Sequence, residues 1–512
     1  MKKTICILLV FAMLALCFVS CGDDKPAESK PAESQPATSA DTGTSADTSE
    51  PVSEETSQAD IWKNENGDYM IIGEVKNFGG KEFSILVRGA KSGGTYQSDD
   101  FTTGSELYGE VLDTAVVERN HFVEDTYGVT LVIHKEDEMN SLINADLAEG
   151  GNYDLVMPTL PTLATLAGDG NLLDLRTFDD IHLEAPWYDQ NANETFSMNH
   201  QTFFTTGDIT ILNKVCTVGM LFGKDLLALH PDLEDPYVLV KEHRWTYDKM
   251  KEMAKAVTAD TDGEAGMSIK DTWGFLTSYG DAVNLYGAAG QHICEKDNND
   301  YPYFYLGQSE TAQTILLQIL KDMADRGTWC VYAQDFPADI WVTSLDAIEE
   351  GRILFRPSAF SAMTKLRKRG VNFGVIPLPL WNEDQDNYYS YCGTGQTAGV
   401  GILRSCNDPE YSAYMLEAIS AASKNYVTRA YVDVTIKVKD APDDVESLEM
   451  IELIFDNILY DIGDVNNFGG INQLISGLVS AGSSDLASML DANQDIIEDK
   501  IDSLIEAYEA LS

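Results

Sequence analysis

The chain has 512 residues, too many for one hydrophobic core, which stops growing at roughly 250–300 residues; two lobes or domains are therefore expected. Apolar residues make up 44% and aromatic residues 10% of the sequence, a composition that excludes a mainly disordered protein. The formal net charge of −48 repels phosphate backbones and argues against nucleic acid as a partner.

The first residues have the layout of a secretory signal peptide. Lys2 and Lys3 form a positive start, and residues 5–19 form an apolar run. This run is shorter than the roughly 20 apolar residues that a membrane-spanning helix needs, so it predicts export rather than a membrane span. We assign the signal peptide to residues 1–20.

The signal ends in Phe-Val-Ser-Cys, which resembles a bacterial lipobox. In a lipobox the cysteine is acylated on sulfur and becomes the first residue of the mature protein, a role that falls to Cys21 here. Phe18 departs from the leucine that is usual at its position. The alternative is ordinary signal cleavage without a lipid.

Residues 21–60 differ sharply in composition from the rest of the chain. They are rich in Pro, Ala, Ser, Thr, Asp and Glu, and the segment KPAES occurs twice in succession. Such a stretch cannot bury enough apolar surface to offset backbone entropy, so it predicts a disordered tether behind the lipidated cysteine.

From about residue 61 onward, apolar periodicity predicts a series of alternating strands and helices. The expected strands are residues 83–88, 129–133, 153–157, 218–222, 353–355 and 373–376. The expected helices are residues 109–127, 139–149, 247–257, 312–326, 409–422 and 486–511. This alternation is typical of βαβ units and predicts an α/β body built on parallel sheet.

The sequence has no catalytic signature. The seven histidines form no HExxH pattern, and no GxSxG, Walker A or GxGxxG segment occurs. Outside the first 21 residues lie five cysteines without CxxC spacing, which argues against a zinc or dithiol site. One disulfide is possible among these five cysteines, but their odd number leaves at least one free thiol.

Six segments together resemble, in order, the extracellular solute-binding proteins of ABC importers, the group that includes maltose-binding protein. They are YDLVMPTLPTLATLAGDGNLLDL (153–175), GDITILNKVCTVGMLFGKDLLA (207–228), DPYVLVKEHRWTYDKMKEMAKAVT (235–258), EEGRILFRPSAF (349–360), NFGVIPLP (372–379) and NDPEYSAYMLEAIS (407–420). Gly223 departs from the asparagine that is usual in the second segment. The resemblance covers nearly all of the expected folded body.

The resemblance implies a two-lobed, periplasmic-binding-protein-like fold of type II, hinged by crossover segments. It places the N-lobe at residues 61–213 and 398–450, and the C-lobe at residues 214–397 and 451–512. It also implies a monomer on the extracellular face of the cytoplasmic membrane, held by its lipid and delivering a solute to the transmembrane subunits of an ABC permease.

A carbohydrate site needs aromatic faces for the sugar rings, and Asp, Asn or Arg side chains for the hydroxyl groups. Predicted loops supply such residues: Asp208, Tyr279, Asp281, Trp341, Arg356, Phe360, Trp381 and Tyr391. The resemblance to the solute-binding proteins implies that four of these residues lie closest to the ligand cleft: Asp208, Tyr279, Arg356 and Phe360. The alternative is that the aromatic residues belong to the core or to the lobe surface.

An acidic segment resembles an EF-hand loop in its spacing. Asp260, Asp262, Glu264 and Asp271 occupy its positions 1, 3, 5 and 12. Ala265 stands where a glycine is expected, and position 12 is Asp rather than Glu. We therefore favour an acidic surface turn, with a structural calcium ion as the alternative, and expect no other cofactor.

The sequence thus predicts a lipid-anchored, non-enzymatic binding protein that captures a small solute, a carbohydrate in the first instance. Two alternatives come from other classes: a secreted carbohydrate-active enzyme and a surface sugar-sensing module.

Overall fold

The computed structural model describes residues 61–90, 95–436 and 445–511. Contacts along the chain group all of these described residues in one compact unit. The predicted signal peptide, Cys21 and the whole of the tether lie outside the described residues. Within them, no helix is both long and apolar enough to cross a membrane.

The first sheet is parallel, as predicted. Its order is β2-β1-β3, with β1 at Lys81–Arg88, β2 at Val129–Glu136 and β3 at Leu155–Val156. Inner residues of β1 such as Phe83 and Ile85 are fully buried, because helices cover this small sheet. Its helices are α1 (Glu110–Tyr127), α2 (Met139–Glu149), α3 (Leu160–Gly168), α4 (Gln190–Phe196) and α14 (Pro409–Ser423).

The second sheet is mixed rather than parallel, which corrects the sequence-based prediction. Its order is β10-β4-β9-β5-β8, with β4 at Val218–Gly223, β5 at Trp273–Thr277, β8 at Cys330–Tyr332, β9 at Ile353–Ala359 and β10 at Phe373–Ile376. Strand β5 runs parallel to β8 and β9, but β4 runs antiparallel to both β9 and β10. The order of strands and helices along the chain does not show in which direction a strand joins the sheet. It could therefore not reveal that β4 runs antiparallel to its neighbours.

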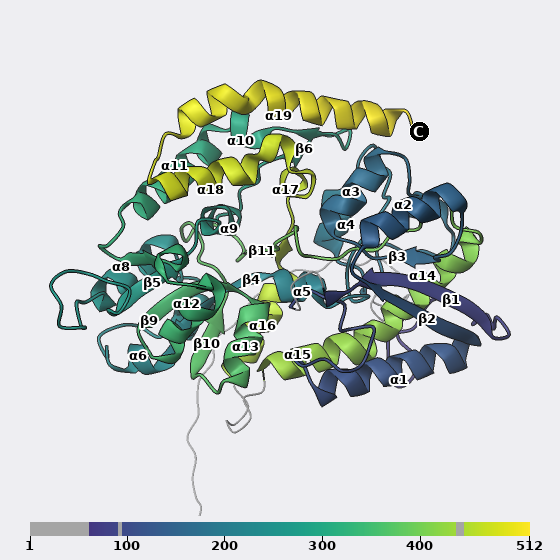
Figure 1. Cartoon of the computed structure of the whole chain (residues 1–512), viewed down its shortest axis with the longest axis horizontal. Coiled ribbons are helices and arrows are strands. Elements are labelled where there is room, and N and C mark those ends of the chain that lie inside the picture. Colours follow the sequence, from purple (N-terminus) through teal and green to yellow (C-terminus); the bar gives the residue numbers. More distant parts are fainter. Residues whose placement is uncertain (1–60, 91–94, 437–444, 512) are drawn as a thin grey trace, which may run out of the picture. The chain divides into compact units, whose positions relative to one another are not determined.

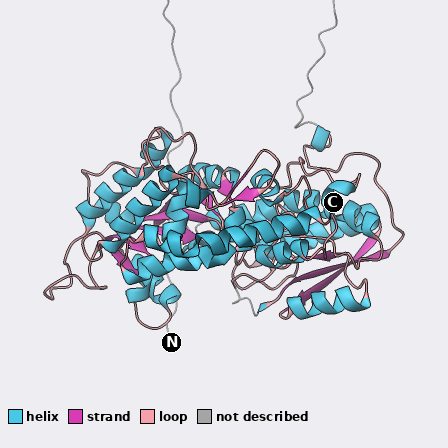
Figure 2. Cartoon of the chain, turned by 90° about the horizontal axis from the view of Figure 1, so that it is seen from above, coloured by secondary structure: helices cyan, strands magenta, loops and turns pink. Residues whose placement is uncertain are grey.

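Helices cover both faces of the second sheet. They are α6 (Lys224–Ala228), α7 (Pro236–Lys241), α8 (Tyr247–Val257), α9 (Asp281–Ala288), α10 (Tyr305–Gln308), α11 (Glu310–Ala324), α12 (Ile340–Glu349), α13 (Phe360–Lys368) and α16 (Val445–Asp456). The short hairpin β6 (Glu295–Lys296) and β7 (Pro302–Tyr303) lies beside them. Figure 2 shows the strands in two separate groups with helices around each.

The chain crosses between the two sheets three times. The first crossing contains α5 (Leu212–Cys216), and the second follows β11 (Ser390–Tyr391). These two crossings touch: Thr217 bridges Cys392, and the amide of Gly393 donates to the carbonyl of Cys216 at 3.1 Å. The third crossing contains a π-helical turn, Lys424–Thr428, followed by α15 (Arg429–Ile436).

The C-terminal segment contacts elements of both halves. It comprises β12 (Ile458–Leu459), which pairs with β11, then α17 (Ile462–Asn466), α18 (Ile471–Ala481) and α19 (Leu486–Glu509). Helices α17 and α19 contact α3 beside the first sheet, whereas α18 contacts α9 and α11 beside the second. In Figure 1 the yellow helix α19 extends from above α11 toward α3. The exact lobe boundaries stay a prediction.

All five cysteines in the described residues are buried and free, so no disulfide forms among them.

Candidate functional site

The carboxyl end of β1 carries a buried arginine that contacts the second crossing. Arg88 is the last residue of β1, and its Nη2 donates to Oε1 of Gln396 at 3.0 Å, while its Nη1 donates to the Gln396 carbonyl. Burial lowers the pKa of Arg88. The side chain therefore fixes the end of the first sheet against the loop that connects the two halves.

A polar contact between the two halves lies close to the end of β1. The hydroxyl of Tyr96, which follows β1, lies 3.4 Å from Oγ of Ser361 in the first turn of α13. Burial raises the pKa of the Tyr96 phenol. We call this region, defined by Arg88, Tyr96, Ser361 and Gln396, the lobe seam.

A buried Asp–Arg couple lies beside two neighbouring strands of the second sheet, β5 and β9. Asp281 begins α9, just after β5, and accepts hydrogen bonds from the Ser278 amide at 2.6 Å and the Thr277 hydroxyl at 3.1 Å. Burial nevertheless raises the pKa of Asp281. Arg356 lies in the middle of β9, close enough for its charge to act on Asp281.

Arg356 is buried, with 5% of its surface exposed, yet its Nη1 atom has no hydrogen-bond partner among the described residues. Burial lowers its pKa to about 10, and Asp281 only partly offsets that effect. A buried guanidinium without a partner is costly unless another group satisfies it. The site is thus suited to a polar group supplied from outside the chain.

Beside this couple lies an aromatic surface. The ring of Tyr279 is half-buried and lies 5.4 Å from the ring of Tyr332, and the guanidinium of Arg326 stands 4.2 Å from the Tyr332 ring centre. The structure therefore places three of the sequence-predicted residues, Tyr279, Asp281 and Arg356, beside the inner strands β5 and β9 of the second sheet.

Asp208 lies instead at the junction of the first and third crossings. Its carboxylate contacts Nζ of Lys214 at 2.9 Å, Nζ of Lys424 at 2.8 Å and the Thr428 hydroxyl at 2.9 Å. Burial alone would raise its pKa, but the two ammonium groups outweigh that effect and lower the pKa to about 2. In this structure its oxygens serve to hold the two crossings together.

The remaining predicted residues lie apart from the Asp–Arg couple. Phe360 has no exposed surface, and Tyr391 is buried in β11. Trp381 stacks on Tyr247 with ring centres 5.3 Å apart, whereas Trp341 is 56% exposed on α12. Their contact with a ligand stays a prediction.

The acidic loop brings three of its four predicted residues together. One oxygen each from Asp260, Asp262 and Asp271 lies within 4.8 Å of the others. Asp271 also accepts from the backbone amides of Thr261 at 2.7 Å and Ser268 at 2.6 Å, so it closes the loop without an ion. The fourth residue, Glu264, is exposed. A structural calcium ion stays a prediction.

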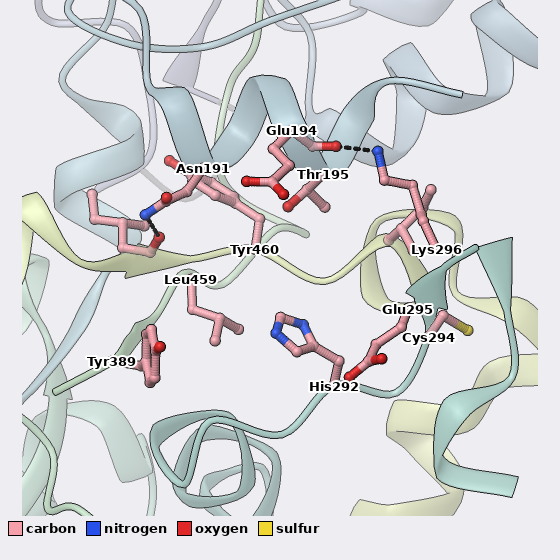
Figure 3. A pocket seen from close by; sticks show the side chains of 12 residues that line it. Asn191, Glu194, Thr195, His292, Cys294, Glu295, Lys296, Tyr389, Leu459 and Tyr460 are labelled. Atoms are coloured by element: carbon pink, nitrogen blue, oxygen red, sulfur yellow. Dashed lines mark hydrogen bonds between the residues drawn. The ribbon is translucent and has the colours of Figure 1, made fainter. Parts of the chain in front are cut away.

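A cavity of about 430 Å³ opens beside the second crossing. Residues of α4 form one wall, and the segment from His292 to β6 forms the opposite wall (Figure 3). Strand β12 and Tyr389 complete it. We call it the crossover cavity. Its polar side chains are Asn191, Glu194, Thr195, His292, Glu295, Lys296, Tyr389 and Tyr460.

Sequence reasoning missed the lobe seam and the crossover cavity. For Arg88 a signal existed, because it ends a predicted strand and ligands commonly bind outside the carboxyl ends of strands in α/β sheets. For Tyr96, Ser361 and Gln396 there was none, since their contacts depend on how the two halves meet. The cavity residues come from segments more than 250 positions apart.

No family model matches the chain, and no curated protein matches it. Solved structures do match. A cyclo/maltodextrin-binding protein complexed with maltotetraose is 15% identical with a TM-score of 0.55, over 82% of this chain and 97% of that one. An ABC substrate-binding protein from Listeria monocytogenes in complex with cycloalternan is 11% identical with a TM-score of 0.52, over 84% and 99%.

The maltose-binding protein of Listeria monocytogenes, in complex with maltose, is 14% identical with a TM-score of 0.52, over 82% of this chain and 98% of that one. The fold is that of the two-lobed solute-binding proteins. This confirms the predicted fold class. The matches span nearly the whole of each neighbour, so the solute-binding fold accounts for both sheets and the three crossings.

Proposed function

We propose that this protein captures a carbohydrate between its two lobes and delivers it to the membrane subunits of an ABC importer, without chemical change. The observation that carries the proposal is the likeness in fold to three proteins solved with cycloalternan, maltotetraose and maltose. Identity of 11–15% leaves the ligand itself to be decided by this chain's own residues.

The residues beside β5 and β9 support a carbohydrate. Tyr279 offers a half-exposed ring face for the C–H surface of a sugar, and the buried Asp281 and Arg356 offer an acceptor and donors for its hydroxyl groups. A site built of buried polar groups favours the ligand that satisfies them and rejects one that leaves them unpaired.

Delivery requires that the bound and free forms differ. Three crossings join the two sheets at their base, and the Tyr96–Ser361 hydrogen bond across the seam is long, at 3.4 Å. A ligand that contacts both lobes stabilises the closed arrangement because it makes more contacts there. The lipid on Cys21 and the tether would keep the closed form near a permease.

Calorimetric titration of the purified protein with maltose, maltotetraose and cycloalternan tests the proposal, followed by chromatography of each sugar after prolonged incubation. We expect saturable binding of at least one sugar and complete recovery of it unchanged. Hydrolysed or transferred products would replace the proposal with a carbohydrate-active enzyme. Absence of binding across these and a wider sugar panel would also overturn it.

A further inference from the structure

The crossover cavity lies apart from Tyr279, Asp281 and Arg356, none of which lines it. Its walls come from both halves: α4 follows the first sheet, whereas His292 and β6 follow α9 of the second. Its volume of about 430 Å³ falls within the roughly 300–1,000 Å³ range of small-molecule sites. The proposed sugar site therefore does not explain it.

The two basic side chains in the cavity wall, Lys296 and His292, each lie next to a carboxylate of the chain. Nζ of Lys296 contacts Oδ1 of Asp300 at 2.5 Å and also donates to the carbonyl of Ser197 at 3.1 Å. Nδ1 of His292 lies 3.7 Å from Oδ2 of the buried Asp461. Neither group therefore contributes an uncompensated positive charge to the cavity.

Two carboxylates remain. Neither Glu194 nor Glu295 forms an ion pair within the part of the chain that the structure describes; Glu295 only accepts from the Tyr303 hydroxyl at 2.9 Å. In Figure 3 Glu194 lies on the α4 wall, and Glu295 lies on the opposite wall beside the ring of His292. An occupant that bridges the walls would meet a carboxylate at each end.

The rest of the lining is apolar or aromatic. Leu459 and Ile462 form an apolar surface, and Tyr389 presents a half-buried ring. A methylene chain packs on such a surface, and an ammonium group is attracted to an aromatic face. Two carboxylates beside an apolar surface and an aromatic ring thus point to an organic cation.

We propose that the crossover cavity is a second binding site, for a small aliphatic diamine whose ammonium groups pair with Glu194 and Glu295. The two carboxylates come from opposite walls, so the diamine spans the cavity, and its methylene chain covers Leu459. The lining of this cavity includes none of Tyr279, Asp281 and Arg356, so the diamine does not compete directly with the proposed sugar.

Calorimetric titration with 1,4-diaminobutane tests the proposal, with 1,4-butanediol as the uncharged match. We expect one diamine site per chain and no binding of the diol. Saturating maltotetraose should leave the diamine stoichiometry at one, because the sites are separate. Equal binding of the diol, or diamine binding displaced by the sugar at equal stoichiometry, would contradict the proposal.

The variant Glu194→Gln/Glu295→Gln should weaken diamine binding at least tenfold. Its matched control is Glu149→Gln/Glu506→Gln, which removes two exposed carboxylates elsewhere on the surface and should bind like the wild type. Thr195→Trp, which fills the cavity from α4, should abolish binding with the melting temperature preserved. An equal loss in the control would show only general attraction to an acidic surface, and unchanged binding in the Thr195→Trp variant would place the diamine elsewhere.

Discussion

The guanidinium of Arg356 is buried, and the surrounding protein compensates its positive charge only in part. Its Nη1 atom is buried without a partner among the described residues, and its pKa falls to about 10 because burial disfavours the charge. Such a group destabilises the free protein, and under the proposed function a ligand hydroxyl would accept from it. Function and stability should therefore oppose each other at this residue.

We accordingly predict opposite effects of Arg356→Met on stability and on binding. Replacing a buried, poorly satisfied charge by an apolar side chain of similar length should leave the melting temperature of the free protein unchanged or higher. Sugar affinity should fall by about tenfold or more, because a hydrogen bond to a charged group contributes about 1.5–3 kcal/mol. Thermal melts and calorimetry measure the two effects. A large fall in melting temperature would show that Arg356 has a structural role instead.

At the scale of elements, the carboxylate of Asp208 forms ion pairs with both the first and the third crossing. Asp208 contacts Lys214 in α5 and Lys424 in the π-helical turn, so the two lysines belong to different elements. A π-turn places one extra residue in the helix, and such turns are often found at functional positions. Here it presents Lys424 and Thr428 to the same carboxylate.

We predict that Asp208→Asn destabilises the protein at pH 7 by about 3 kcal/mol, because it leaves buried ammonium groups without their counter-charge. Since the pKa of Asp208 is lowered to about 2 from 3.8, its stabilising effect is present above pH 3.8 and is lost as the pH falls through 2. The variant and the wild type should therefore converge toward pH 2. Urea unfolding at pH 7 and at pH 2–4 measures this, and a constant difference would contradict the assigned pairs.

Individual elements were predictable where the local pattern is complete. Helix α8 begins and ends where the sequence predicted, because Thr246 accepts from the Lys249 amide at its start and buried side chains recur at helical spacing along it. The direction of β4 was not predictable, since strand patterns are the same whichever way the strand runs. Short elements such as α5 and β11 carry too few residues for a period to be visible.

The site shows the same division. Polar and aromatic residue types in loops indicated Tyr279, Asp281 and Arg356, and the structure gathers these three. The same reasoning selected Phe360, which is fully buried. An aromatic residue that follows a strand looks the same in the sequence whether it lies in a core or in a cleft. Contacts such as Tyr96 with Ser361 join segments 265 positions apart and require the meeting of two sheets.

At the scale of the whole molecule, the account depends on movement of two lobes about three crossings. The crossings contain the Asp208 pairs and the contact of Cys216 with Gly393, whereas the other polar contacts between the halves, such as Tyr96 with Ser361 and Lys296 with Ser197, join segments far apart in the chain. This distribution suits rotation about the crossings with each lobe kept rigid, as in hinged domain closure.

Single-molecule fluorescence transfer tests this central claim most directly, with dyes on Glu149 beside the first sheet and Glu350 beside the second, both exposed. All five native cysteines of the described residues are buried, so two engineered cysteines can be labelled selectively after Cys21 is replaced by serine. We predict that a sugar found to bind by calorimetry shifts the transfer distribution, and that Arg356→Met shifts the required concentration upward by about tenfold. Saturating sugar without any change in transfer would contradict capture by closure of the lobes.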